Sequence, residues 1–425
     1  MTAVEPALGR EADVGSDAGP ARVLLLVPAR TYRAADFLTA AGRLGVDVAI
    51  GSDGALPLGG HPVVHVSPAD LEGTLGRIMA LGGRFDAVVA ADTPMLALAA
   101  VVAERMGLPH NPVEAVIAAA DKAAQRRRWA DAAVAQPEFQ LVPAGASADA
   151  VRRAAVAAGF PCVVKAVSLS ASQGVLRADD PAAAVAAALR IRRILATSGR
   201  PAGEPLLVER YVPGYELSID GLLTSGGLAV TAVFDRPEVP EGPTFEETML
   251  VTPSRLPKPV LARAIATAER AARALGLIHG PIHAELRIDG RGGPARPVML
   301  ELAARTIGGL CSRALRLGGG MSLEELVLAD ALGYPTPRHH TPRPAGVLML
   351  PVPRQGVLRA VEGRSDAAAV PGITGLTITI PTGQRVHPLP DGDRYLGFIF
   401  AEGDTPEEVE QALGTARGRV RVLVD

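Results

Sequence analysis

The chain has 425 residues, of which 48% are hydrophobic, 21% charged and 3% aromatic. At roughly 100 to 200 residues per domain, this length predicts two to four domains with sizeable cores, which excludes a disulfide-stapled miniprotein. The formal net charge of -2 excludes the strongly basic surface that binding to nucleic acid or to an anionic membrane requires. We expect a small-molecule or protein partner instead.

The two cysteines, Cys162 and Cys311, are far apart and belong to no C-x-x-C motif, so the sequence predicts neither a disulfide framework nor a zinc ribbon. This cysteine usage favours a reducing cytoplasm. Residues 1–20 contain four acidic residues and no apolar core, which is typical of a disordered tail and not of a secretory signal. No apolar run reaches the roughly 18 to 20 residues of a membrane-spanning helix, so we expect a soluble protein.

The first ordered segment, Arg22 to Pro28, is a short and continuously apolar run, which is typical of a strand covered on both faces of a parallel sheet. Strands and helices then alternate, with short turns rich in glycine, proline and aspartate. This alternation predicts a doubly wound α/β domain over residues 21–112. Its expected strands are 22–28, 46–50, 63–66 and 86–91, and its expected helices are 34–44, 69–81 and 94–106.

A second unit is predicted over residues 113–335, with a smaller lid subdomain at about 135–205. It begins with an alanine-rich helix predicted over 113–130. Asp289-Gly290 between two apolar alternations is a strong hairpin signal. The other expected elements are the strands 139–142, 160–167, 175–177, 206–211, 216–223, 229–234, 280–288 and 297–303, and the helices 147–158, 181–196 and 258–275.

The last part of the chain, residues 336–425, is punctuated by prolines that separate short apolar runs. This pattern predicts a small β-rich C-terminal domain. Its expected strands are 346–350, 374–380, 395–400 and 420–424, and its expected helix is 406–418.

Two glutamates lie on the two strands of the hairpin predicted around Asp289-Gly290. Because alternate side chains of a strand share a face, Glu285 lies with His283 and Arg287. By the same rule, Glu301 shares a face with Arg305 on the partner strand. Two convergent carboxylates suit Mg²⁺, which typically takes one or two protein carboxylates and completes its shell with water and phosphate oxygens. A cross-strand ladder of salt bridges on a solvated face is the alternative.

Only three of the 43 basic residues are lysines, namely Lys122, Lys165 and Lys258. In a chain that otherwise uses arginine, a lysine indicates a site that needs a compact ammonium group. Lys165 precedes the serine-rich loop 168–174, whose hydroxyls and backbone N–H groups could cover phosphate oxygens as a lid. None of the lysines is followed by Ser or Thr, which excludes a P-loop. A plain serine-rich hairpin with an exposed lysine is the alternative.

A third candidate segment contains Glu209, Val212 and Glu216 around a Pro-Gly turn. A strand that runs into such a turn could offer backbone groups to an adenine edge, and Glu216 could accept hydrogen bonds from ribose hydroxyls. Glutamates beside a Pro-Gly turn are, however, usually solvated. The chain has no G-x-S-x-G motif and no cysteine in an electropositive setting, so hydrolase chemistry is excluded.

The order of these elements resembles the ATP-grasp superfamily: lysines, a Ser/Gly loop, Glu209 with a trailing Glu216, then Glu285 and the E-x-x-x-R motif of Glu301 and Arg305. The similarity covers about residues 115–330, and residues 21–112 are similar to the domain that precedes the grasp fold. The C-terminal domain more weakly resembles that of biotin-carboxylase-like and purine-pathway members.

The sequence from Glu301 to Cys311, ELAARTIGGLC, is similar to the L-amino-acid ligase branch, whose members join a carboxylate to an amine. Many other ATP-grasp enzymes have Asn where this chain has Ala303. That difference leaves the number of bound metal ions open.

The resemblance implies ATP and Mg²⁺ as cofactors, with one or two ions and Mn²⁺ as a possible substitute, and a homodimer. It also implies roles for individual residues. They are Lys165 and Arg305 in catalysis, Lys122, Lys165, Ser168, Ser172, Gly174, Glu209, Val212 and Glu216 in ATP binding, Glu285 and Glu301 as metal ligands, and His283, Arg287 and Arg313 as candidate substrate contacts.

The activity implied is ligation of a carboxylate, activated as an acyl phosphate, to an amine, with release of ADP and phosphate. Two alternatives stay open: a carboxylase or ligase that uses bicarbonate or formate, and a non-catalytic protein that only binds nucleotide. Substrates would be small molecules, and neither nucleic acid nor a membrane is expected as a partner.

Overall fold

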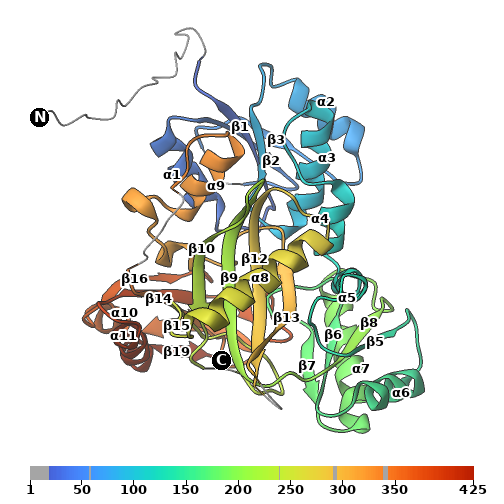
Figure 1. Ribbon diagram of the computed structural model, residues 1–425. Coiled ribbons are helices and arrows are strands. Elements are labelled where there is room, and N and C mark those ends of the chain that lie inside the picture. Colours follow the sequence, from blue (N-terminus) through green and yellow to red (C-terminus); the bar gives the residue numbers. More distant parts are fainter. Residues whose placement is uncertain (1–18, 57–58, 239, 291–293, 338–342) are drawn as a thin grey trace, which may run out of the picture.

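The computed structural model describes residues 19–425 apart from 57–58, 239, 291–293 and 338–342 (Figure 1). The predicted tail, residues 1–20, falls almost entirely outside this range, as does the tip of the predicted turn after Asp289. Among the described residues, no helix is both long enough and apolar enough to cross a bilayer. Both cysteines are buried, and their thiols are free.

The N-terminal unit is the doubly wound α/β structure predicted from the sequence. Its four strands are parallel, in the order β3-β2-β1-β4. Alternate side chains of the central strand enter different cores, Leu25 on one face and Leu24 on the other, which explains its unbroken apolar run. The elements are β1 (Arg22–Val27), α1 (Ala34–Leu44), β2 (Asp47–Ser52), β3 (Val63–His65), α2 (Leu71–Met79), β4 (Ala87–Ala90), the 3-10 helix η1 (Thr93–Met95) and α3 (Leu96–Met106).

The helix predicted over 113–130 is wrong as a single element, because two helices occupy this stretch. They are α4 (Val113–Ala119) and α5 (Lys122–Asp131). Asp121 between them has an extended backbone, and its side chain accepts a hydrogen bond from the N–H of Ala124, which starts the new helix. The break makes Lys122 the first residue of α5.

The predicted lid subdomain contains a four-stranded antiparallel sheet in the order β5-β8-β6-β7. Two helices pack together and form one hydrophobic core with this sheet. The sequence predicted all six elements: β5 (Phe139–Val142), α6 (Ala148–Ala158), β6 (Cys162–Ala166), β7 (Val175–Ala178), α7 (Pro181–Thr197) and β8 (Leu206–Arg210).

The largest sheet has eight strands in the order β13-β12-β9-β10-β11-β14-β18-β16. Helix α8 lies across the strands of its first half (Figure 1). Strand β11, which the sequence did not reveal, links the central and C-terminal parts. The elements are β9 (Tyr215–Thr224), β10 (Gly227–Asp235), β11 (Met249–Thr252), α8 (Lys258–Ala274), β12 (Gly280–Asp289), β13 (Arg296–Ala303), β14 (Ala345–Leu350), β16 (Ile373–Ile378) and β18 (Gly397–Glu402).

The C-terminal region contributes three strands to this sheet and also carries a smaller sheet in the order β17-β15-β19. The domain boundary predicted between residues 335 and 336 stays a prediction, and the large sheet runs across it. The remaining elements are β15 (Gly356–Glu362), α10 (Arg364–Ala368), β17 (Arg385–Val386), α11 (Pro406–Arg419) and β19 (Arg421–Val424).

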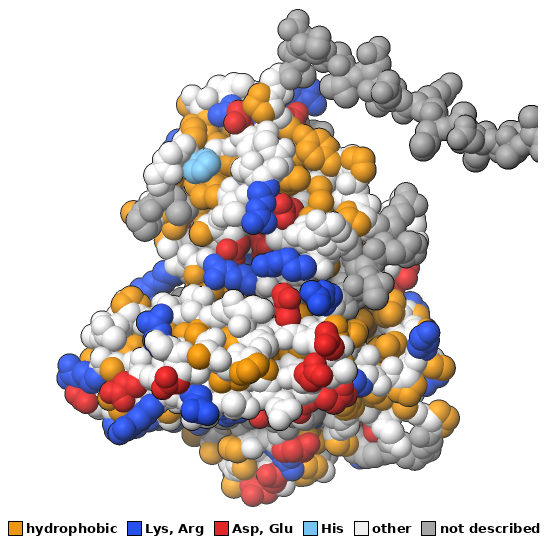
Figure 2. Space-filling view, turned by 90° about the vertical axis from the view of Figure 1, so that its left-hand side faces the viewer, with side chains coloured by type: hydrophobic (Ala, Val, Ile, Leu, Met, Phe, Trp, Pro, Cys, Tyr) orange, Lys and Arg blue, Asp and Glu red, His pale blue; other side chains and the backbone are white. Residues whose placement is uncertain are grey.

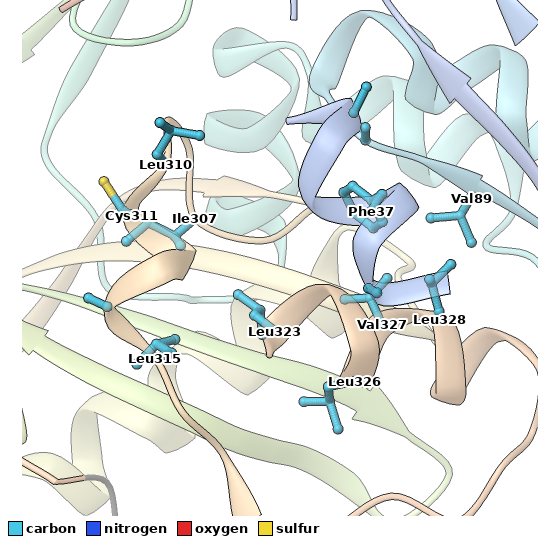
Figure 3. Packing of buried hydrophobic residues seen from close by; sticks show 14 of the residues in the cluster. Phe37, Val89, Ile307, Leu310, Cys311, Leu315, Leu323, Leu326, Val327 and Leu328 are labelled. Atoms are coloured by element: carbon cyan, nitrogen blue, oxygen red, sulfur yellow. The ribbon is translucent and has the colours of Figure 1, made fainter. Parts of the chain in front are cut away.

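A shared hydrophobic core joins the N-terminal unit to the rest of the molecule. Helix α9 (Leu323–Ala331), which the sequence analysis did not predict, packs against α1. Phe37 and Val89 from the N-terminal unit lie in one cluster with Val327 and Leu328 of α9 (Figure 3). Figure 2 shows the outside of this part of the molecule, where basic side chains gather in a band at mid-height. The N-terminal unit is therefore packed onto the body and is not a tethered appendage.

Candidate active site

One cavity brings together most of the residues predicted to form the site. The lid sheet, the central sheet, the N-terminal unit and the C-terminal region all contribute to its wall. The predicted residues that line it are Lys122, Lys165, Ser172, Glu209, Val212, Glu216, His283, Glu285, Arg287, Glu301 and Arg305.

The two predicted metal ligands face each other across the β12–β13 hairpin. Glu285 pairs with Glu301 in the strand register, next to an irregularity at Leu286. Like charges in this position repel each other unless cations lie between or beside them. Lys122 Nζ lies 3.0 Å from Glu301 Oε1, and Arg236 Nη2 lies 3.4 Å from Glu285 Oε1. The predicted convergence of the two carboxylates is therefore present.

The chemistry of this donor set fits Mg²⁺. Within the described ranges, no group of three or more His, Cys, Asp or Glu side chains is arranged to hold a metal ion. A site of two carboxylates is therefore not a closed structural zinc site, which needs four protein ligands. It suits Mg²⁺, which takes one or two carboxylates and fills its shell with phosphate oxygens and water. Glu285 and Glu301 are the residues that would hold such an ion.

Both cavity lysines are buried and ion-paired, although charged lysines are rarely buried without a partner. Lys122 Nζ also donates to the carbonyl of Leu169 at 2.5 Å, which ties α5 to the lid loop. Lys165 Nζ on β6 lies 2.7 Å from Glu209 Oε2. The third lysine, Lys258, begins α8 and does not line the cavity.

Glu209 lies between two buried cations. Its Oε1 accepts from Arg126 Nε at 2.5 Å, and its Oε2 pairs with Lys165. Burial alone would raise the pKa of this carboxyl, but the charges of Arg126 and Lys165 lower its pKa to about 2. Arg126 also lies over the Trp129 ring, with 5.2 Å between the guanidinium carbon and the ring centroid. Sequence reasoning did not identify Arg126 as part of this arrangement.

Arg236, which the sequence analysis missed, is 3% exposed and lies among three carboxylates. It contacts Glu216 through Nη1, and its Nη2 lies 2.8 Å from Glu247 and 3.4 Å from Glu285. Burial raises the pKa of Glu247 to about 7, against the opposing effect of Arg236. Burial also opposes ionisation of Glu285, but Arg236 and His283 lower its pKa well below the usual range.

Arg287 lines the cavity, but its donors are used within the protein. Its Nε donates to Glu216 at 2.6 Å, and its Nη1 donates to Tyr211 Oη at 2.7 Å and to the carbonyl of Val212 at 2.8 Å. Its Nη2 donates to the carbonyl of Pro240 at 3.1 Å. Arg287 therefore fixes the segment between β8 and β9, which fits a structural role better than the predicted substrate contact.

His283 lies at the cavity wall between two carboxylates. Its Nδ1 is 3.0 Å from Asp220 Oδ2, and its Nε2 is 3.4 Å from Glu285 Oε1. Burial alone would lower the pKa of this imidazole, but Asp220 and Glu285 raise it to about 9. Asp220 pairs in register with His283 across β9 and β12, a neighbour relation that a sequence without strand order does not reveal.

Three predicted site residues do not line the cavity. Ser168 donates its hydroxyl to the carboxylate of Glu204 at 2.9 Å. Gly174 has a φ of +64° and directs its N–H toward the carbonyl of Pro390 at 3.4 Å. Arg313 forms a bidentate ion pair with Asp36 of α1, at 2.9 Å for both contacts. The first two stabilise the lid loop, and Arg313 joins the body to the N-terminal unit.

Two protein-family models match parts of this chain. The family model of the ATP-grasp domain matches residues 158–314. A second model, L-amino acid ligase C-terminal domain 2, matches residues 348–425. Residues 158–314 therefore form an ATP-grasp domain, and residues 348–425 form the C-terminal domain found in L-amino acid ligases.

Two proteins that are similar to this chain in sequence carry names of a synthase and a ligase. The chain is 31% identical over 311 residues to carnosine synthase 1 from Gallus gallus, and this alignment covers 69% of this chain and 33% of that protein. The chain is also 25% identical over 260 residues to alanine–anticapsin ligase from Bacillus subtilis strain 168. That alignment covers 57% of this chain and 53% of that protein. The chain thus spans about a third to a half of the length of these two relatives.

A solved structure supports the fold along nearly the whole chain. The crystal structure of L-amino acid ligase from Bacillus licheniformis superposes with a TM-score of 0.78 at 24% sequence identity, covering 95% of this chain and 98% of that one. At this level of identity the likeness establishes the fold, and the chemistry depends on the site.

Proposed function

We propose that the chain is an ATP-dependent ligase that activates a carboxylate as an acyl phosphate and joins it to an amine. The observation that carries this proposal is the convergence of two carboxylates, two lysines and Arg305 on one cavity. The names of the relatives, L-amino acid ligase and alanine–anticapsin ligase, point to amino acids as the first substrates to test.

The first step is attack by a carboxylate oxygen of the acyl donor on the γ-phosphorus of ATP. A bond forms between that oxygen and phosphorus, the bond to the β,γ-bridging oxygen breaks, and ADP leaves. An anion must here approach a polyanion, so the main task of the protein is to offset charge and fix geometry. Lys122, Lys165 and Arg305 supply fixed positive charge for this purpose.

In the second step, the amine nitrogen attacks the acyl carbon, and an amide bond forms. The bond between the acyl carbon and the phosphate oxygen breaks, so that inorganic phosphate leaves, and the nitrogen loses a proton. When bound by Glu285 and Glu301, Mg²⁺ would supply further charge neutralisation for the phosphates. The lid loop that contains Ser172 covers one side of the cavity. Exclusion of water by this loop would protect the acyl phosphate from hydrolysis.

The test is a phosphate-release screen with ATP, Mg²⁺ and pairs of amino acids and other carboxylates, followed by mass spectrometry of the products. We expect ADP release that requires both an acyl donor and an amine, with a product mass equal to the sum of the two minus water. ADP release with bicarbonate or formate alone would favour the alternative activity. ATP binding without ADP formation for every pair would indicate a non-catalytic nucleotide-binding protein.

The homodimer implied by the family resemblance and the expected cytoplasmic location stay predictions. The free, buried cysteines are compatible with a reducing compartment and have no bearing on the oligomeric state.

A further inference from the structure

The guanidinium of Arg305 is held by the N-terminal unit. Its Nε donates to the hydroxyl oxygen of Thr93 at 2.7 Å, and its Nη1 donates to the carbonyl of Thr306 at 2.8 Å. Thr93 opens η1, which follows β4 of the N-terminal sheet after Ala91 and Asp92. Two of the three guanidinium nitrogens are therefore fixed, one of them by a side chain more than 200 residues away in sequence.

The neighbours of Arg305 are fixed in the same way. Arg33, which is 2% exposed, donates to the hydroxyl of Thr306 and to the carbonyl of Ala91, the latter at 2.7 Å. From the other side, the N–H of Ile307 donates to Asp220 Oδ1 at 2.8 Å. The segment that follows β13 is thus held between the N-terminal unit and the central sheet.

Thr93 is itself held in place by its surroundings. Its backbone N–H donates to Asp92 Oδ1 at 3.1 Å, and this contact caps the short helix η1. Met95 at the end of η1 is buried in the core, with 1% of its surface exposed. Among the described residues, Nη2 of Arg305 has no hydrogen-bond partner, and Arg305 lines the cavity. The arrangement therefore fixes Nε and Nη1 of the guanidinium and leaves Nη2 for a ligand.

We propose that Thr93 is a positioning residue for Arg305, so that the N-terminal unit takes part in catalysis by aiming this guanidinium at the reacting phosphoryl or acyl phosphate group. The inference rests on the proposed function. An arginine side chain is long and has many rotamers, so an unsupported guanidinium would lose conformational entropy when it is held in one position. Charge stabilisation of a transition state depends on donors that are already in place, so an acceptor that fixes Nε contributes to the rate.

The matched variants are Thr93→Val, which keeps the shape and removes the acceptor, and Thr93→Ser, which keeps the acceptor. Thr39→Val is the control, because Thr39 lies exposed on α1 and bonds only to the carbonyl of Ala35. We expect Thr93→Val to lower kcat for amine-dependent ADP release about tenfold, the scale of one hydrogen bond to a charged group. The KM for ATP should stay within about twofold of the wild-type value. The unfolding midpoint should shift by less than about 2 °C. Thr93→Ser should retain at least half of the rate, and Thr39→Val all of it.

A double-mutant cycle with Arg305→Gln separates positioning from a general structural role. If Thr93 acts through Arg305, Thr93→Val has no further effect on kcat once Arg305 is replaced. An equal loss in both backgrounds, an unchanged kcat in Thr93→Val alone, or no rescue by Thr93→Ser would each overturn the inference. Failure of the proposed function is a separate result, since wild-type protein would then release no amine-dependent ADP, and the inference would fall with it.

Discussion

Glu209 provides a quantitative test of the charge arrangement beneath the lid. Its side chain is 2% exposed and lies within hydrogen-bond distance of Arg126 and Lys165, whose side chains are 1% and 10% exposed. The variant Glu209→Gln keeps the shape of the side chain but leaves two buried cations without their counter-charge. We expect a large loss of stability in the region formed by the lid sheet and α5.

Two independent arguments give the magnitude of this loss. Removing one partner of a buried ion pair typically costs about 3 to 5 kcal/mol. The difference between the ordinary carboxyl pKa of 4.5 and the pKa of about 2 for Glu209 corresponds to about 3 kcal/mol. Because the folded-state pKa is lowered, this stabilisation is fully present above about pH 4.5. It is lost as the pH falls toward 2.

The assay is urea unfolding of wild type and Glu209→Gln at pH 7 and at pH 3. We expect a loss of about 3 kcal/mol at pH 7 and a clearly smaller difference at pH 3. Glu138→Gln is the matched control, because Glu138 is exposed and its carboxylate lies 3.4 Å from the guanidinium of Arg210, which is also exposed. It should cost less than about 1 kcal/mol. A loss below about 1 kcal/mol for Glu209→Gln at pH 7, or a loss independent of pH, would refute the reasoning.

Three further predictions concern the metal site, the lid and the thiols. Glu301→Gln should reduce amine-dependent ADP release at least 100-fold in a protein that is still folded, although less stable because the buried Lys122 loses its counter-charge, and normal turnover would defeat the assignment as a metal ligand. Asp391→Asn breaks a half-exposed ion pair between Arg190 of the lid and the C-terminal region. It should raise the KM for ATP less than about threefold, and a tenfold rise in a nucleotide titration would contradict this. Burial raises the pKa of Cys162 to about 11 and raises that of Cys311, so a disulfide reagent at pH 8 should label neither thiol until the protein is unfolded. Rapid labelling of the native protein would show the burial to be wrong.

Local patterns were sufficient to predict which residues share one face of a strand. His283, Glu285 and Arg287 line the same cavity because alternate side chains of β12 point to the same side. The pairing of Glu285 with Glu301 depends in addition on the register shift between Glu285 and Leu286, which the sequence pattern did not reveal. The sequence also contained a signal for the break between α4 and α5, because Asp121 is a typical helix-capping residue. The alanine-rich residues around it favoured the prediction of one continuous helix.

Contacts between distant elements were not predictable in this way. Arg236 meets three carboxylates only because β10 lies beside β9 and that strand lies beside β12, and no local pattern fixes this order. The bond from Arg305 to Thr93 depends on how the N-terminal unit packs through α1 and α9. Arg313 was predicted as a candidate substrate contact because it follows the segment that ends at Cys311. In the structure, its side chain forms an ion pair with Asp36 of α1, which helps to hold the N-terminal unit on the body.

The measurement that tests the central claim most directly follows oxygen from the acyl donor. The donor carboxylate is labelled with oxygen-18, and the protein is incubated with ATP, Mg²⁺ and the amine found by the screen. An acyl phosphate intermediate requires that one labelled oxygen per turnover appears in inorganic phosphate, with ADP as the nucleotide product. Label in AMP, or unlabelled phosphate accompanying amide formation, would contradict the account.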